Sequence, residues 1–100
     1  MLWAIYRIAR PNSAAIREKA LQRHRDYLHS QKGIVIISGA TLTDDGEVVT
    51  GSLLIVNVNS RAEAKAFSDS DPFTKGGMFK SITITRMRKG TWNPQAAEGA

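Results

Sequence analysis

The sequence predicts an α+β protein in which a four-stranded antiparallel sheet carries two helices on one face. Segments that favour strands and segments that favour helices follow one another in the order β-α-β-β-α-β. Right-handed crossovers place both helices of such a chain on the same side of the sheet. With 100 residues, 42% of them apolar and 23% charged, the chain has the size and composition of one globular domain. The expected strands cover residues 2–9, 34–37, 53–58 and 79–87, and the expected helices cover residues 13–32 and 60–68.

The ends of the first helix are indicated by residues with known capping preferences. Pro11 ends the first strand, and Asn12 or Ser13 is expected to cap the helix that follows. Gly33 is expected to end the helix in the left-handed conformation, which glycine adopts without steric cost. The predicted apolar face of this helix consists of Ile16, Ala20, Leu21, Tyr27 and Leu28.

The middle of the chain contains a hairpin followed by a helix start. Asp44-Asp45-Gly46 is a turn signal, with glycine where a positive φ is needed. The strand over 53–58 is nearly continuously apolar, which is typical of a strand covered on both faces. Ser60 and Glu63 form a capping box at the start of the second helix. The expected buried face of that helix consists of Ala62, Ala66 and Phe67.

The first strand also predicts a partner for the sheet. Trp3 and Ile5 project to one face, and the opposite face carries Leu2, Ala4, Tyr6 and Ile8. Neither set is polar enough to lie bare in water. Because the helices cover one face only, a second copy is the simplest cover for the other, and we expect a homodimer through the open sheet face.

The composition excludes several kinds of site. The chain has no cysteine, which rules out disulfides, thiolate nucleophiles and cysteine–zinc sites. No nucleotide-binding glycine motif is present, and Asp44, Asp45 and Glu47 lack the spacing of a calcium loop, so we expect neither a metal nor another cofactor. No apolar run approaches the roughly 20 residues of a membrane span, and the opening residues lack the basic segment of a signal peptide. We therefore expect a cytoplasmic protein with no membrane partner.

The charge leaves two kinds of partner to weigh. Fourteen basic and nine acidic residues give a net charge of +5, which suits a basic soluble surface, nucleic acid or an anionic small molecule. RNA-recognition domains share this order of elements, but they stack bases on aromatic side chains of the third strand. Residues 51–58 contain no aromatic side chain. We expect a small-molecule ligand and no nucleic acid.

His24, Asp71 and Arg17 are the candidate site residues. His24 projects into the middle of the apolar face of the first helix with Arg17 close beside it, whereas His29 falls on the opposite, charged side. If His24 met Asp71, the carboxylate would select one imidazole tautomer and raise the basicity of the ring, making a general base. A second interpretation stays open, in which His24 is a core or boundary residue and Asp71 caps a helix that starts at Pro72.

This pattern resembles the YciI-like, or YCII-related, family over about residues 3–88. The matching segments are Arg17…His24-Arg-Asp-Tyr-Leu28, Ser38-Gly39, Asp45-Gly46, Gly51-Ser52, Glu63-Ala64 and Asp71-Pro-Phe73…Gly77-Met-Phe79. The resemblance implies a ferredoxin-like fold of the dimeric α+β barrel type, and an active site formed by His24 and Asp71. Members often carry an arginine three residues before the histidine, where this chain has Leu21. Relatives with a known role suggest lyase-like or dehydrochlorinase-like chemistry on small aromatic compounds.

Together these observations predict a YciI-like domain over residues 1–90 and a C-terminal tail over residues 91–100. The expected function is that of a small cofactor-free enzyme doing elimination or isomerisation chemistry, with His24 as general acid/base, Asp71 orienting it and Arg17 contacting the substrate. One alternative is a non-catalytic module that binds a small ligand in the same pocket, and another is an RNA-binding domain. The fold alone does not decide between them.

Overall fold

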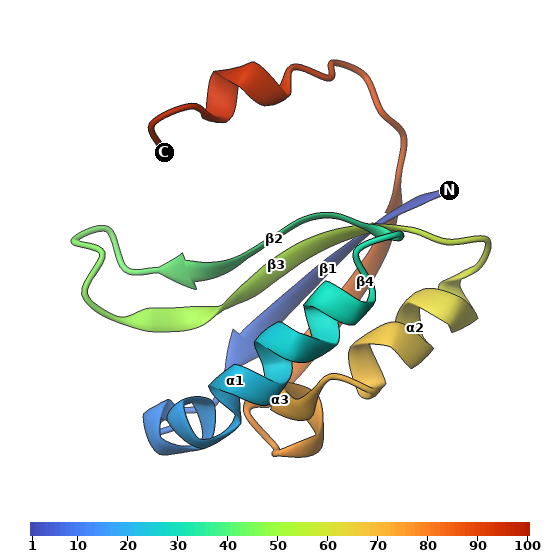
Figure 1. The fold of residues 1–100 in the computed structure, drawn as a ribbon. Coiled ribbons are helices and arrows are strands. Elements are labelled where there is room, and N and C mark those ends of the chain that lie inside the picture. The colour runs from blue at the N-terminus through green and yellow to red at the C-terminus, as the bar shows by residue number, and fades with distance from the viewer.

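The computed structural model describes residues 1–100 as an antiparallel sheet with its helices on one face (Figure 1). The strands lie in the order β2-β3-β1-β4. The elements are β1 (Leu2–Ala9), α1 (Ala14–Ser30), β2 (Val35–Leu42), β3 (Val49–Asn57), α2 (Arg61–Asp69), α3 (Pro72–Lys75), β4 (Phe79–Met87) and the 3₁₀ helix η1 (Pro94–Ala97). The predicted fold class and order of elements are confirmed.

Alternation along β1 places every second side chain beneath the helices. Trp3, Ile5 and Arg7 are buried, whereas Tyr6, on the other face, is exposed. The buried apolar side chains form two clusters. The first consists of Trp3, Ile5, Leu54, Val56, Ala64 and Phe67, and the second of Ala20, Phe73, Met78 and Phe79. The second cluster joins α1 to α3 and positions the candidate site.

α1 is shorter than predicted and ends differently. Ser13 occupies the N-cap position, but its side chain makes no capping hydrogen bond. The prediction that Gly33 ends the helix in the left-handed conformation is wrong, because Gly33 has a negative φ and α1 ends at Ser30. The N–H of Gln31 donates to carbonyls three and four residues back, which tightens the last turn without a left-handed residue. No helix of this structure is both long and apolar enough to cross a membrane.

The hairpin of β2 and β3 is longer than predicted. Both strands extend past their apolar runs because the polar residues near the turn continue the antiparallel pairing. The expectation that β3 is covered on both faces is not met within one chain. Leu54 is buried beneath the helices, but its neighbour Leu53 is 41% exposed on the open face.

α2 has the predicted start but a different buried face. The Ser60 side chain accepts a hydrogen bond from the N–H of Glu63 at 3.1 Å, as in a capping box. Phe67 is buried as predicted, whereas Ala62 and Ala66 are exposed. The buried residues of α2 are Ala64, Phe67 and Ser68. At 100° per residue these three share one side of the helix, and Ala62 and Ala66 lie on the opposite side.

The C-terminal segment lies apart from the rest of the fold. After β4 the chain passes over the open face of the sheet and forms η1, within the region predicted to be a loose tail (Figure 1). The backbone hydrogen bonds of residues 91–100 all lie within that segment. Trp92, its one aromatic side chain, is 58% exposed.

Gly51 is required by the close approach of β3 to β1. A Cβ atom at this position would lie 1.9 Å from the carbonyl oxygen of Arg7. We expect Gly51→Ala to lower the free energy of unfolding by about 2–3 kcal/mol, because β1 must move away. The melting temperature should fall by about 10 °C or more, measured by circular dichroism. Gly33→Ala, with nothing within 4 Å of its Cβ position, is the control, and equal melting temperatures would contradict the prediction.

Candidate active site

Asp71 lies at the N-terminus of α3 and is fully buried. Its Oδ1 accepts a hydrogen bond from the N–H of Phe73 at 3.0 Å, so the carboxylate caps α3. The same carboxylate lies against His24 of α1, with Nδ1 2.8 Å from Oδ1 and 2.9 Å from Oδ2. The two interpretations that the sequence left open are therefore compatible, because a carboxylate has enough lone pairs for both contacts.

His24 points from α1 toward the sheet and stacks on Phe73. The two ring centroids lie 3.8 Å apart with an angle of 9° between the planes. Only 13% of the His24 side chain is exposed, whereas His29 is exposed on the outer side of α1, as predicted. An ionised carboxylate only accepts hydrogen bonds, so in the neutral ring Nδ1 carries the proton and Nε2 is the free base. Nε2 has no hydrogen-bond partner within the protein.

Arg7 lies on the other side of Asp71 and is completely buried. Its Nη2 is 2.8 Å from Asp71 Oδ2, an ion pair in which both side chains have 0% exposure. This contact is not aligned as a hydrogen bond, so the two groups attract mainly through their charges. Nε donates to Ser52 Oγ at 2.8 Å and Nη1 to Thr74 Oγ1 at 3.2 Å. The guanidinium also lies over the ring of Phe79, 4.4 Å from its centroid. Arg7 thus ties β1, β3 and α3 together around the carboxylate.

The surroundings of Asp71 keep it ionised. Burial by itself would raise the pKa of this carboxyl. The hydrogen bond from His24, the charge of Arg7 and the N–H of Phe73 outweigh burial, so the pKa of Asp71 lies below its ordinary value. Burial lowers the pKa of Arg7, which the charge of Asp71 opposes, and an arginine retains its proton in proteins. At neutral pH the site therefore contains a buried pair of opposite charges beside the imidazole.

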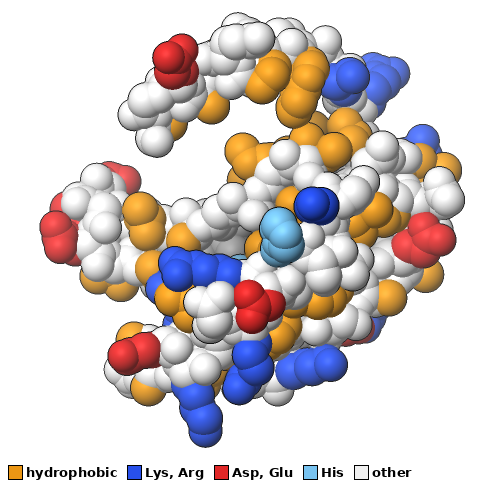
Figure 2. Space-filling model, viewed as in Figure 1, with side chains coloured by type: hydrophobic (Ala, Val, Ile, Leu, Met, Phe, Trp, Pro, Cys, Tyr) orange, Lys and Arg blue, Asp and Glu red, His pale blue; other side chains and the backbone are white.

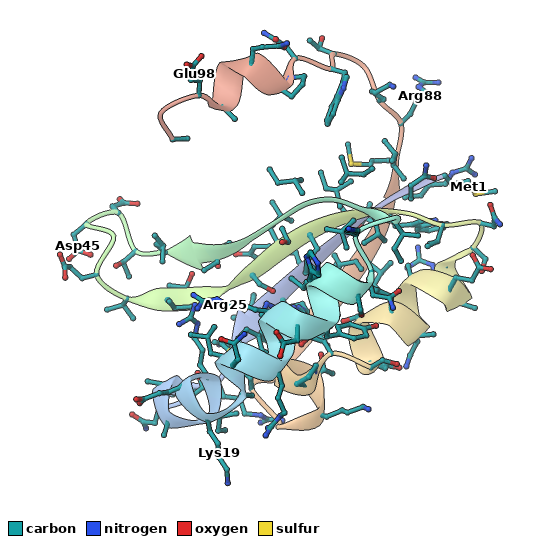
Figure 3. The ribbon with its side chains drawn as sticks, viewed as in Figure 1. Met1, Lys19, Arg25, Asp45, Arg88 and Glu98 are labelled. Carbon is teal, nitrogen blue, oxygen red and sulfur yellow. The ribbon has the colours of Figure 1, made fainter.

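A cavity of about 230 Å³ lies between α1 and the β2–β3 hairpin, next to this group. In Figure 2 the surface is hollowed at this place, and Lys or Arg side chains border the hollow. Arg25, labelled in Figure 3, extends from α1 toward the hairpin. The lining residues are Arg7, Arg17, Leu21, His24, Arg25, Leu28, Ser38, Gly39, Ala40, Gly51, Ser52, Leu54, Phe73 and Met78. No group of three or more His, Cys, Asp or Glu side chains could hold a metal ion.

All three predicted site residues lie in this region. His24 and Asp71 are in direct contact, and Arg17 lines the cavity with its guanidinium 6.0 Å from the centroid of Phe73. Arg7 and Arg25 also lie at the cavity, and neither was among the residues predicted from the sequence. A signal for Arg7 was present, since the period of two that buries Trp3 and Ile5 puts Arg7 on the same face. A charge on the buried face of a strand requires a partner of opposite charge.

Comparison with known proteins supports a relationship over most of the chain. The model of the YCII-related domain matches residues 1–88. The solved structure of 5-chloro-2-hydroxyhydroquinone dehydrochlorinase (TftG) from Burkholderia phenoliruptrix AC1100, in complex with 2,5-dihydroxybenzoquinone, is 36% identical. The similarity covers 90% of this chain and 96% of that chain, with a TM-score of 0.82. Among curated proteins, no match is found.

More distant structures share the fold alone. Protein Atu4242 from Agrobacterium tumefaciens is 14% identical with a TM-score of 0.54, and covers 94% of this chain and 98% of its own. An antibiotic biosynthesis monooxygenase is also 14% identical, with a TM-score of 0.52 over 91% of this chain and 100% of its own. These neighbours confirm the ferredoxin-like fold of the dimeric α+β barrel type. From the match over residues 1–88 and the similarity to the dehydrochlorinase, the chain belongs to the YCII-related domain family.

Proposed function

We propose that this protein is a small enzyme that transfers protons on a hydroxylated ring compound without a cofactor, using His24 as general acid/base. The observation that carries the proposal is the orientation of the imidazole. Asp71 holds Nδ1 at 2.8 Å, which leaves Nε2 as the basic nitrogen beside the cavity. The similarity to a dehydrochlorinase of a chlorinated hydroxyhydroquinone supports elimination as the reaction class.

The chemistry needs one base that can also return a proton. Nε2 of His24 accepts the proton of a ring hydroxyl and returns it to a ring carbon, which moves the electron pair and converts the hydroxyl to a carbonyl. If that carbon carries chlorine, loss of a second hydroxyl proton forms another carbonyl, and chloride leaves with the electrons of the C–Cl bond. The net change is loss of HCl, with no external oxidant. Without a leaving group, the same proton transfer is an isomerisation.

In this proposal Arg17 and Arg25 bind the anionic form of the substrate. Both line the cavity, and neither makes a salt bridge within the protein. The one carboxylate at the site, Asp71, is already paired with Arg7. Two unpaired guanidinium groups beside the base would stabilise the phenolate that forms when a ring hydroxyl loses its proton. A planar, anionic small molecule is therefore the expected ligand.

A homodimer through the open sheet face also belongs to this proposal. Tyr6 and Leu53 are 43% and 41% exposed there, on adjacent strands paired with each other. Large exposed apolar side chains on neighbouring strands are typical of a surface that another molecule covers. Sedimentation of the purified protein measures its mass directly.

We expect His24→Gln to reduce turnover of a chlorinated hydroxyhydroquinone by at least about 100-fold, because the base is lost. Chloride release and the absorbance of the quinone product measure the rate. His29→Gln is the matched control, since His29 is the other histidine and lies exposed on the opposite side of α1. Equal rates for His24→Gln and the wild type would contradict the proposal. Binding of the ring compound without any chemical change would favour the non-catalytic module instead.

A further inference from the structure

We propose that the β2–β3 hairpin of a second copy of this chain docks into the groove between the C-terminal segment and the open face of the sheet. The two surfaces match in polarity and are opposite in charge, and they lie at opposite ends of the same sheet. The inference rests on the proposed homodimer. The test of this inference measures mass, whereas the test of the proposed catalytic function measures turnover. Either proposal can therefore be contradicted while the other stands.

The groove is apolar with a basic rim. It has a volume of about 1010 Å³ and lies between the open face and the segment that follows β4. Figure 2 shows hydrophobic side chains on both sides of the gap beneath this segment, with Lys or Arg side chains at one end of it. The apolar lining includes Ile36, Ile37, Ile55, Met87 and Trp92, and the basic rim consists of Arg86, Arg88 and Lys89.

The hairpin has the complementary character. Its tip carries Asp44, Asp45 and Glu47, three acidic residues without a basic residue among them, and none makes a salt bridge. Beside them, Leu42 is 51% exposed and Val48 57% exposed. When such a loop buries its apolar side chains against another surface, a surface of opposite charge is favoured, because a surface of like charge would repel the acidic side chains.

The two surfaces cannot meet within one chain. Strand pairing places Leu2 beside Met87 at the end of the sheet that borders the groove, and Ile8 beside Gly51 at the end that borders the hairpin turn. Figure 3 shows Asp45 and Arg88 at these opposite ends. A two-fold axis between two facing sheets that exchanges their ends brings each hairpin to the groove of the partner. The favourable contact is then made twice, as in other isologous dimers.

The docked hairpin is continuous with the candidate active site. Residues at its base, Ser38, Gly39, Ala40 and Ser52, line the cavity next to His24. β2 is an edge strand whose residues 36–40 are all exposed in the single chain. A partner that holds the hairpin would therefore also hold one wall of the cavity.

The test exchanges charges between the two surfaces and follows the mass of the full-length chain by sedimentation. One variant carries Asp44→Lys and Glu47→Lys, and the other carries Arg88→Glu and Lys89→Glu. Asp45 is kept, because its carboxylate accepts hydrogen bonds from Thr43 and Glu47 that hold the turn. Each variant alone should dimerise at least about 100-fold more weakly than the wild type, because like charges then face each other twice. An equal mixture of the two variants should form mixed dimers of near wild-type stability.

Three results would overturn the inference: a monomeric wild type at micromolar concentration, variants that dimerise normally, or a mixture that does not recover. Lys19→Glu with Arg23→Glu, on the exposed side of α1, controls for the change in net charge and should leave dimerisation unchanged. If a charge-exchange variant does not fold, Trp92→Ala tests the same groove without changing charge. It should weaken the dimer at least about tenfold while leaving the circular dichroism spectrum unchanged, because Trp92 is 58% exposed in the single chain.

Discussion

Replacing Arg7 with methionine is expected to lower the free energy of unfolding by about 3–5 kcal/mol, because Asp71 then stays buried without its counter-ion. Water does not screen this pair, since both side chains have 0% exposure. The substitution also leaves Ser52 and Thr74 without the donors that they accept from. Urea denaturation at neutral pH measures the loss.

A double-variant cycle separates the ion pair from simple loss of packing. Arg7→Met together with Asp71→Asn should cost less than the sum of the two single substitutions, because the second removes the charge that the first leaves unpaired. Lys65→Met is the control, since it breaks the exposed Lys65–Asp69 pair, in which the side chains are 67% and 49% exposed. That change should cost at most about 1 kcal/mol. Additive effects at Arg7 and Asp71 would refute a direct electrostatic link.

Asp71→Asn is expected to reduce turnover by about 10²–10⁴-fold while His24 itself remains in place. An ionised carboxylate can only accept a hydrogen bond from Nδ1–H, whereas an amide can also donate a hydrogen bond to an unprotonated Nδ1. Donation by the amide stabilises the tautomer with its proton on Nε2, and that tautomer cannot act as the base. The rate is measured by chloride release, as for the His24 variant.

The tautomer gives a second measurement that needs no substrate. ¹⁵N NMR of the two imidazoles should show Nδ1–H at His24 in the wild type and a larger share of Nε2–H in Asp71→Asn. Asp69→Asn, which alters an exposed carboxylate two residues away, should change neither the tautomer nor the rate. If the tautomer stays the same while the rate falls, Asp71 does not act through the orientation of His24.

Most of the fold could be predicted because its determinants are local. Alternation along β1 and β4, the turn at Gly46 and the Ser60–Glu63 capping box all depend on residues close together in the chain. The predictions that were wrong concern features that depend on the final folded arrangement. Gly33 was not needed as a left-handed residue, because backbone bonds from Gln31 close the last turn of α1. The packing of Phe67 determined which side of α2 is buried, and Ala62, which was predicted to be buried, is exposed.

The candidate site could be predicted only in part. The helical period placed His24 on the inner face of α1, and the Asp71-Pro72 sequence marked a helix start. That these two side chains meet depends on α1 and α3 packing together, which brings residues 47 positions apart into contact. A local sequence pattern carries no information on contacts over such a separation. The resemblance to the family was therefore needed to pair His24 with Asp71.

Arg7 shows most clearly what tertiary structure decided. The sequence by itself determined the strand, its alternating faces and therefore the side on which Arg7 lies. Whether that side chain turned outward to water or remained inside depended on a serine of β3 and on a buried carboxylate and a threonine of the α3 region. A buried guanidinium is stable only when such partners surround it, and they are assembled only when the sheet and helices pack. Local preferences thus determined the strand and its two faces. Direct contacts with residues far away in the sequence determined that Arg7 remains buried.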